Sequence, residues 1–225
     1  MNFLAPLLLT IPILALGESN IPRAETDPTP RWPYYASIFI DDAWFCTGSL
    51  VSDTLVLTSA RCVQNGAFFD ISLGDQQFSS YEAIVHPDYD PSTLFANLAV
   101  IRLREPAQVE PAPLPLVGDP LEVGDFVCLD DLDDVNFVCA PVISNTDCDA
   151  FYGGVSEDSV CLGQSGNMCG ALYVGAPGDT TDPGTTLVGV NTMGGSSACE
   201  VGLPIRLTRV EYHINWINEL FVSKH

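Results

Sequence analysis

The chain has 225 residues and carries 29 acidic against eight basic side chains, a formal net charge of -21. This length suits one large β-barrel domain or two small ones with a buried core. Nucleic acid and anionic membranes would repel so acidic a protein, so we expect neither as a partner. The charge would attract a basic protein partner, although the same charge would also serve solubility alone.

The first seventeen residues contain no charged side chain, and a short apolar run ends near the small residues Ala15 and Gly17. This pattern predicts a cleaved secretory signal peptide over residues 1–17. The weaker alternative is a membrane anchor, because the run is too short for about 30 Å of hydrocarbon. Residues 18–32 are rich in proline and polar groups and predict an extended lead segment.

Eight cysteines follow the signal, and an even number in a secreted chain predicts four disulfides. Their spacing lacks the paired CxxC of a zinc site and the chain has three histidines, so we expect no metal and no other cofactor. Together with the signal, these cysteines indicate a secreted, extracellular protein.

Short β-like runs punctuated by Gly, Pro, Asp and Asn recur along the chain and predict an all-β barrel or sandwich. They occupy residues 35–40, 55–58, 83–85, 99–103, 126–128, 137–142, 172–174 and 187–191. Only residues 210–221 have helical periodicity, with Val210, Ile214, Ile217 and Leu220 in one apolar stripe that we expect to pack on the core. The acidic stretch 130–134 predicts a solvated turn.

Residues 45–62 read FCTGSLVSDTLVLTSARC. This segment resembles the chymotrypsin-like (trypsin-like, S1) serine proteases, in which a Cys-x-Gly-Ser-Leu strand leads to Leu-Thr-Ala-Ala-His-Cys. VHPDY at 85–89, LAVIRL at 98–103 and PVISNTDC at 141–148 match further segments in the family's order. The resemblance covers residues 33–220, and the wording of 141–148 is closest to digestive and immune proteases of arthropods.

The resemblance implies an all-β fold of two six-stranded antiparallel β-barrels with a C-terminal α-helix over residues 33–225. The chain would cross between the barrels at the proline-rich segment 106–120. It also implies three disulfides: Cys46–Cys62, Cys148–Cys161 and Cys169–Cys199. Cys128 and Cys139 remain, and they flank a short acidic turn between two strands that pair in this fold, so we expect them to bridge that hairpin.

Proteolysis in this family requires a serine nucleophile, a histidine base and a buried aspartate that orients the histidine. The resemblance places Arg61 at the histidine and Asn97 at the aspartate. A guanidinium stays protonated at neutral pH and cannot act as a general base. An amide cannot stabilise an imidazolium as a carboxylate does, and a comparable change in the family template costs about 10⁴ in turnover. His86 matches a non-catalytic histidine, and His213 lies in the terminal helix.

The serine position admits three registers within CLGQSGNMCGALYV, residues 161–174. If Cys169 is the family cysteine, the nucleophile turn is deleted. A gap-free alignment of 172–174 puts Met168 at the serine. A third register selects Ser165, which then precedes the pocket cysteine and is disfavoured. The first two registers leave no serine at the site, and in the third the serine has no base.

Activation and substrate binding are altered as well. Residues 21–24 (IPRA) stand where the activated amino terminus of the family begins, and no basic residue precedes them. The primary pocket would be lined by Thr192, Met193 and Ile205. The branched Ile205 stands where the family has a small residue, so we expect a blocked pocket, with a tolerated substitution as the alternative.

These losses predict a secreted, catalytically inactive homologue, a pseudoprotease that serves as a protein-binding or regulatory module. One alternative is a hydrolase of the same family with a rebuilt active site. The other is an acidic structural protein of a secretion.

Overall fold

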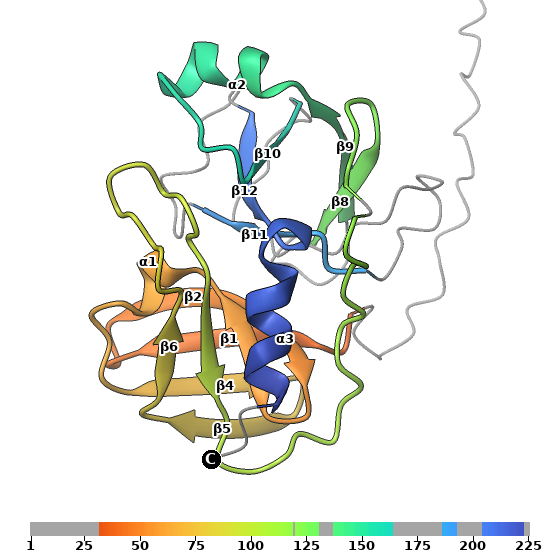
Figure 1. The fold of residues 1–225 in the computed structure, drawn as a ribbon. Coiled ribbons are helices and arrows are strands. Elements are labelled where there is room, and N and C mark those ends of the chain that lie inside the picture. The colour runs from red at the N-terminus through yellow and green to blue at the C-terminus, as the bar shows by residue number, and fades with distance from the viewer. Residues whose placement is uncertain (1–31, 119, 131–136, 164–185, 193–203, 223–225) are drawn as a thin grey trace, which may run out of the picture.

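The computed structural model describes residues 32–118, 120–130, 137–163, 186–192 and 204–222. It contains two curled antiparallel β-sheets followed by a C-terminal helix (Figure 1). The expected signal peptide and all of the lead segment before Trp32 lie outside these residues. The expected fold class, two antiparallel β-units with a terminal helix, is confirmed.

The first sheet has the strand order β5-β4-β1-β2-β3-β7-β6. Its strands are β1 (Tyr35–Ile40), β2 (Trp44–Ser52), β3 (Leu55–Thr58), β4 (Phe69–Leu73), β5 (Gln76–Ser80), β6 (Ala83–Val85) and β7 (Ala99–Arg102). In β4, Phe69, Ile71 and Leu73 are buried and alternate with half-buried residues, which is the period of a strand with one face in the core. The short helix α1 (Ala60–Val63) follows β3 directly.

The second sheet has the order β11-β12-β10-β9-β8 in the described ranges. Its strands are β8 (Phe126–Asp130), β9 (Phe137–Ile143), β10 (Ser159–Leu162), β11 (Gly189–Asn191) and β12 (Ile205–Arg209). The described strands thus divide seven and five instead of the expected six and six. The expected strand 172–174 lies outside the described residues, so the second count is not that of the whole chain. Ser144 is the N-cap residue of helix α2 (Asn145–Tyr152), and its Oγ accepts a hydrogen bond from the amide of Asp147.

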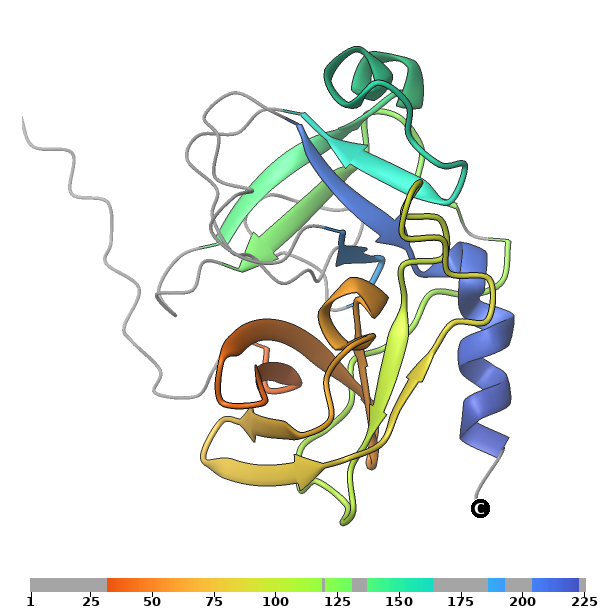
Figure 2. The same cartoon turned by 90° about the vertical axis from the view of Figure 1, so that its left-hand side faces the viewer.

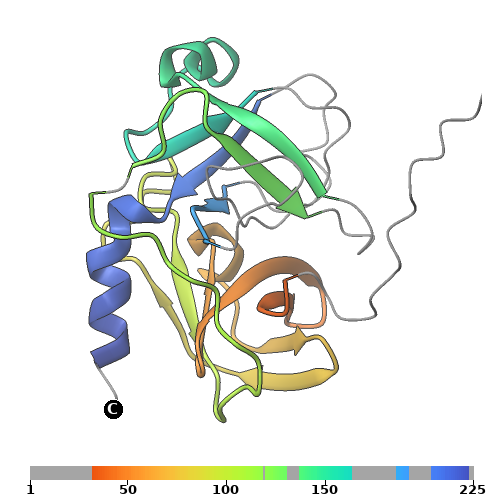
Figure 3. The same cartoon turned by 90° about the vertical axis from the view of Figure 1, so that its right-hand side faces the viewer.

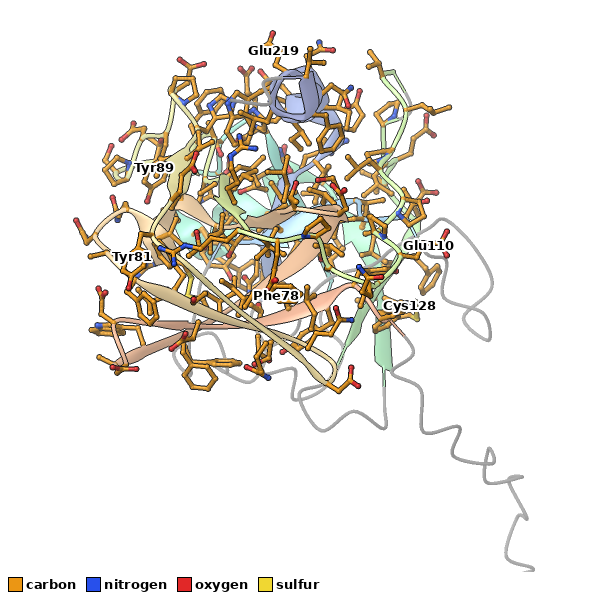
Figure 4. The ribbon with its side chains drawn as sticks, turned by 90° about the horizontal axis from the view of Figure 1, so that it is seen from below. Phe78, Tyr81, Tyr89, Glu110, Cys128 and Glu219 are labelled. Carbon is orange, nitrogen blue, oxygen red and sulfur yellow. A yellow bond between two sulfur atoms is a disulfide. The ribbon has the colours of Figure 1, made fainter. Side chains whose placement is uncertain are left out.

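The helical periodicity near the C-terminus corresponds to a 3₁₀ turn (Glu211–His213) and helix α3 (Ile214–Val222). Val210, Ile214 and Ile217 belong to the main apolar cluster, and Leu220 packs against it. Figures 2 and 3 show α3 lying beside the first sheet, and Figure 4 looks along the helix, with Glu219 on its outer side. No helix in the described ranges combines the length and apolar character needed to cross a bilayer.

Three disulfides in the described residues cross-link the chain within the two halves of the fold. Cys46 is joined to Cys62 with a Cα–Cα distance of 6.3 Å, Cys148 to Cys161 at 6.2 Å, and Cys128 to Cys139 at 3.9 Å. Cys128 and Cys139 face each other across the β8–β9 hairpin, which places their side chains close enough to bond. The fourth expected pair, Cys169–Cys199, lies outside the described residues.

Candidate functional site

Arg61 and Asn97 meet between the end of β3 and the start of β7. Arg61 is an exposed residue of α1, and Asn97 is fully buried just before β7. The backbone amide of Arg61 donates a 2.9 Å hydrogen bond to Oδ1 of Asn97. The two residues that the family resemblance places at the base and its orienting acid are therefore neighbours in space.

The other end of the Asn97 amide reaches the second sheet. Its Nδ2 donates to the carbonyl oxygen of Thr192 at 3.3 Å. Thr192 is itself fixed, because its amide and its Oγ1 both donate to the carbonyl of Arg206, at 3.2 and 2.8 Å. A carboxylate at position 97 would have no proton for the Thr192 carbonyl, so the amide suits this position in a way that an ionised aspartate does not.

A surface pocket of about 440 Å³ opens beside Arg61. Its walls include Trp44 and Phe45 of β2 and the Cys46–Cys62 disulfide. Trp44 is 74% exposed, and the ring of Phe45 packs edge-on against Phe39 at 5.2 Å between centroids. The part of the cleft next to Arg61 is open and aromatic.

The residues expected at the primary pocket are only partly described. Thr192 is buried, and Ile205 lies half-buried at the start of β12, where it packs against the apolar cluster of the second sheet. Met193 and Met168 lie outside the described residues. The blocked pocket therefore stays a prediction from the sequence.

A histidine, an aspartate and a serine also lie close to the Arg61–Asn97 pair: His86, Asp158 and Ser159. Oδ2 of Asp158 accepts from the amide of Ala96 at 2.7 Å and lies 2.8 Å from Nε2 of His213. His86, Asp158 and Ser159 are all buried, with exposed fractions of 6% for His86 and 1% each for Asp158 and Ser159.

Arg206 completes this buried cluster from β12. Its Nε donates to Oγ of Ser159 at 2.9 Å, and its Nη2 donates to Oγ of Ser156 and to the carbonyl of Thr93, both at 2.8 Å. Burial lowers the pKa of Arg206, and the nearby carboxylate of Asp158 partly opposes this shift. Strand alternation explains the placement, because Arg206 points to the face of β12 opposite to Ile205 and Leu207.

Two titrating groups of the cluster have shifted pKa values. The pKa of His86 is lowered, first by burial and then by His213, against the opposing charges of Asp88 and Asp158. Burial alone would raise the pKa of Asp158, but hydrogen bonds from His213, Ser156 and the Ala96 amide lower it overall. The fold therefore favours a neutral His86 and an ionised Asp158.

Metal binding has no support in the described ranges, where no group of three or more His, Cys, Asp or Glu side chains could hold an ion. Sequence patterns did not predict a cluster of Asp158, Ser159 and Arg206, because Arg206 lies 47 residues beyond Ser159 along the chain. The available signal was the basic side chain of Arg206 between the apolar residues Ile205 and Leu207, since a charge buried there requires a polar partner.

Comparison with known proteins identifies relatives over most of the chain. Residues 21–217 match the family model described as Trypsin. Brachyurin from Leptuca pugilator is 33% identical over 210 residues, which cover 83% of this chain and 92% of that protein. Chymotrypsin-C from Mus musculus is 27% identical over 240 residues, covering 90% of this chain and 87% of that protein.

Solved structures share the same fold. The HL collagenase structure superposes with a TM-score of 0.71 at 23% identity, over 88% of this chain and 96% of that chain. Kallikrein-related peptidase 10 gives a TM-score of 0.70 at 24% identity, over 87% of this chain and 98% of that chain.

Proposed function

Because the chain belongs to the trypsin family of serine proteases, we propose that it is a secreted member that does not cleave peptide bonds and that binds or regulates another protein. The observation that carries this proposal is the Arg61–Asn97 pair. The family resemblance aligns these residues with the base and its orienting acid, and the backbone amide of Arg61 donates a hydrogen bond to Oδ1 of Asn97.

Neither residue can perform the chemistry of the position. A guanidinium is a cation without a free lone pair for proton abstraction, so Arg61 cannot activate a serine. Asn97 is a neutral amide whose oxygen and nitrogen are both engaged, with the Arg61 amide and the Thr192 carbonyl. A histidine introduced at position 61 alone would lack the carboxylate that stabilises its protonated form.

The second candidate is a hydrolase that uses His86, Asp158 and Ser159, which have the right residue types and lie near the cleft. Their surroundings favour a structural role. The Ser159 hydroxyl contacts Arg206 Nε and Ser156 Oγ, and Asp158 is engaged by His213 and the Ala96 amide. With 1% exposure, Ser159 offers no approach for a peptide carbonyl in this conformation.

Location and partner follow from the disulfides and the charge. Three disulfides support an oxidising, extracellular compartment. The formal charge of -21 favours a basic protein partner over nucleic acid or an anionic membrane. An acidic structural protein, the third possibility, would show no saturable binding to a particular protein.

Purified protein tested with casein and with fluorogenic peptides decides between the first two candidates. We expect no turnover above that of the variant Arg61→Ala, which serves as the matched control for contaminating protease. Turnover that disappears in Ser159→Ala would support the buried cluster as a working site. Turnover lost in Arg61→Ala would contradict the proposal in another way, because it would assign a catalytic role to Arg61.

Partner binding is tested by immobilising the protein and capturing ligands from the secretion in which it occurs. Affinity for the captured protein should fall as ionic strength rises from about 0.01 to about 0.15 M, because the screening length shortens from roughly 30 to roughly 8 Å. Binding should survive Ile205→Gly, which removes the side chain expected to block the primary pocket. Salt-independent binding, or binding by Ile205→Gly alone, would contradict the proposed mode of binding while leaving the loss of catalysis untouched.

A further inference from the structure

The segment 86–97, which connects β6 to β7, contains two strained residues. Leu94 has φ of 62° and Ala96 has φ of 50°, both in the left-handed region. Residues with a Cβ avoid this region because the Cβ comes too close to the following carbonyl oxygen. Such conformations persist only where the surrounding structure enforces them.

Within the segment, the amide of Leu94 donates to the carbonyl of Asp90 at 2.8 Å. Two further contacts come from the second half of the chain and involve residues on either side of Leu94. Arg206 Nη2 donates to the carbonyl of Thr93, just before Leu94. Oδ2 of Asp158 accepts from the amide of Ala96, two residues further along. A buried cation and a buried anion thus bind the backbone of one strained turn, one before Leu94 and one after it.

The same segment begins with a buried histidine. The ring of His86 lies 4.7 Å from that of His213 and 4.6 Å from that of Trp216, between centroids. Its Nδ1 accepts from the amide of Asp88 at 3.2 Å, which requires that this nitrogen carry no proton. Protonation of His86 would therefore break a hydrogen bond at the base of the segment and place a charge beside His213.

We propose that segment 86–97 is an acid-released latch, held against the second sheet by Asp158 and Arg206 at neutral pH and let go when His86 takes up a proton. Release relaxes Leu94 and Ala96 and frees Asn97 from Thr192 and Arg61. The wall of the cleft beside Arg61 would then change shape. This inference concerns the conformation of the segment and does not depend on whether the protein is a protease.

The other charged groups around His86 set the direction of the response. Two carboxylates, Asp88 on the segment and Asp158 before β10, attract a protonated His86 and so oppose release. Burial and then His213 lower the pKa of His86 by more than these carboxylates raise it, so held His86 favours the neutral form. Other charged side chains lie beside Asp158 and Tyr212. They are Arg206, Arg209, Glu157 and Glu211.

Hydrogen–deuterium exchange of the full chain tests the latch directly. Released His86 titrates near its ordinary pKa of 6.5, whereas burial lowers the pKa of held His86. Between about pH 7.5 and about pH 5.5, one such proton raises the open population by up to about tenfold. After correction for intrinsic exchange, peptides covering 90–97 should show this increase in opening, and peptides covering β3 should change less than about twofold.

Two variants serve as controls. His86→Asn keeps an acceptor for the Asp88 amide but does not titrate, so its segment should open equally at both pH values. Ala96→Gly removes strain without touching His86, so it should reduce opening at both pH values and keep the native ratio between them. A ratio near one in the native protein or in Ala96→Gly, or the native ratio in His86→Asn, would overturn the proposal.

Discussion

Nδ2 of Asn97 donates a hydrogen bond to the carbonyl oxygen of Thr192, and this contact ties the end of the 86–97 segment to the second sheet. An aspartate, the residue that the family resemblance expects here, would direct an ionised oxygen at that carbonyl. The Asn97 amide therefore connects the two halves of the fold through this hydrogen bond.

Asn97→Asp should lower the free energy of unfolding by about 2 kcal/mol at neutral pH, because a buried carboxylate would lack a donor on the Thr192 side. Urea titration measures the change. The deficit should shrink as pH falls towards about 4, because burial raises the pKa of the new carboxyl above that of an ordinary aspartate and its protonated form can donate. Asn97→Ala is the matched control, with a loss that does not vary with pH. An aspartate variant as stable as the native protein at pH 7 would contradict this account of Asn97.

Arg206→Met should lower the free energy of unfolding by about 3 kcal/mol, since it removes one buried cation near Asp158 and three hydrogen bonds. Arg104→Met is the matched control. Arg104 is exposed and stacks on Tyr81 at 4.7 Å, so its loss should cost less than about 1 kcal/mol. Equal losses in the free energy of unfolding for the two variants would mean that buried Arg206 stabilises the fold no more than exposed Arg104 does.

Ala96→Gly should raise the free energy of unfolding by roughly 0.5–1 kcal/mol, because glycine adopts the positive φ of this position without a clash. Ala99→Gly, three residues further in strand β7, should lower it by about 1 kcal/mol through loss of packing and added chain entropy. The opposite signs, measured by thermal or urea unfolding, are the diagnostic result. A destabilised Ala96→Gly would show that position 96 is not strained.

Acid should weaken the fold through His86. Its pKa is lowered in the folded state, so the unfolded chain binds a proton first as pH falls below 6.5. Stability then declines by at most about 1.4 kcal/mol per pH unit until His86 itself protonates. Asp158 has a lowered pKa, so its contribution is present above 3.8 and is lost as pH falls through that lowered value. Acidification also relieves the repulsion among the many carboxylates, which acts in the opposite direction.

The difference between native protein and His86→Asn isolates the histidine, because the repulsion among carboxylates is common to both. The native protein should lose stability relative to the variant between about pH 6.5 and about pH 5. A constant difference across this range would show that His86 titrates alike in the folded and unfolded chain.

Much of the fold was predictable because its strands are short apolar runs between turn residues. The predicted segments 35–40, 55–58 and 83–85 coincide with β1, β3 and β6. Others differ at one end: β7 ends at Arg102, β8 extends to Asp130, β9 extends to Ile143 and β11 begins at Gly189. Helix α2 was missed because only Cys148 in it is buried, although Ser144 followed by Asp147 is a capping signal.

Only one part of the site was predictable, the pair of Arg61 and Asn97, because the family resemblance aligns both residues with neighbouring positions. The buried cluster was not, because the charge of Arg206 between Ile205 and Leu207 does not reveal which residues pair with it. Its partners Thr93, Ser156 and Ser159 come from two other segments. Pairing of this kind depends on tertiary contacts, which periodicity along one strand cannot reveal.

The most direct test of the loss of proteolysis is the intact mass of the purified protein after incubation with a fluorophosphonate, a reagent that modifies an activated serine. An activated serine needs a general base within hydrogen-bonding reach, and Arg61 cannot serve as one. We therefore predict no adduct, with an active trypsin-family protease labelled in the same tube as the control. A stoichiometric adduct on any serine of this chain would contradict the claim that it has lost proteolytic chemistry.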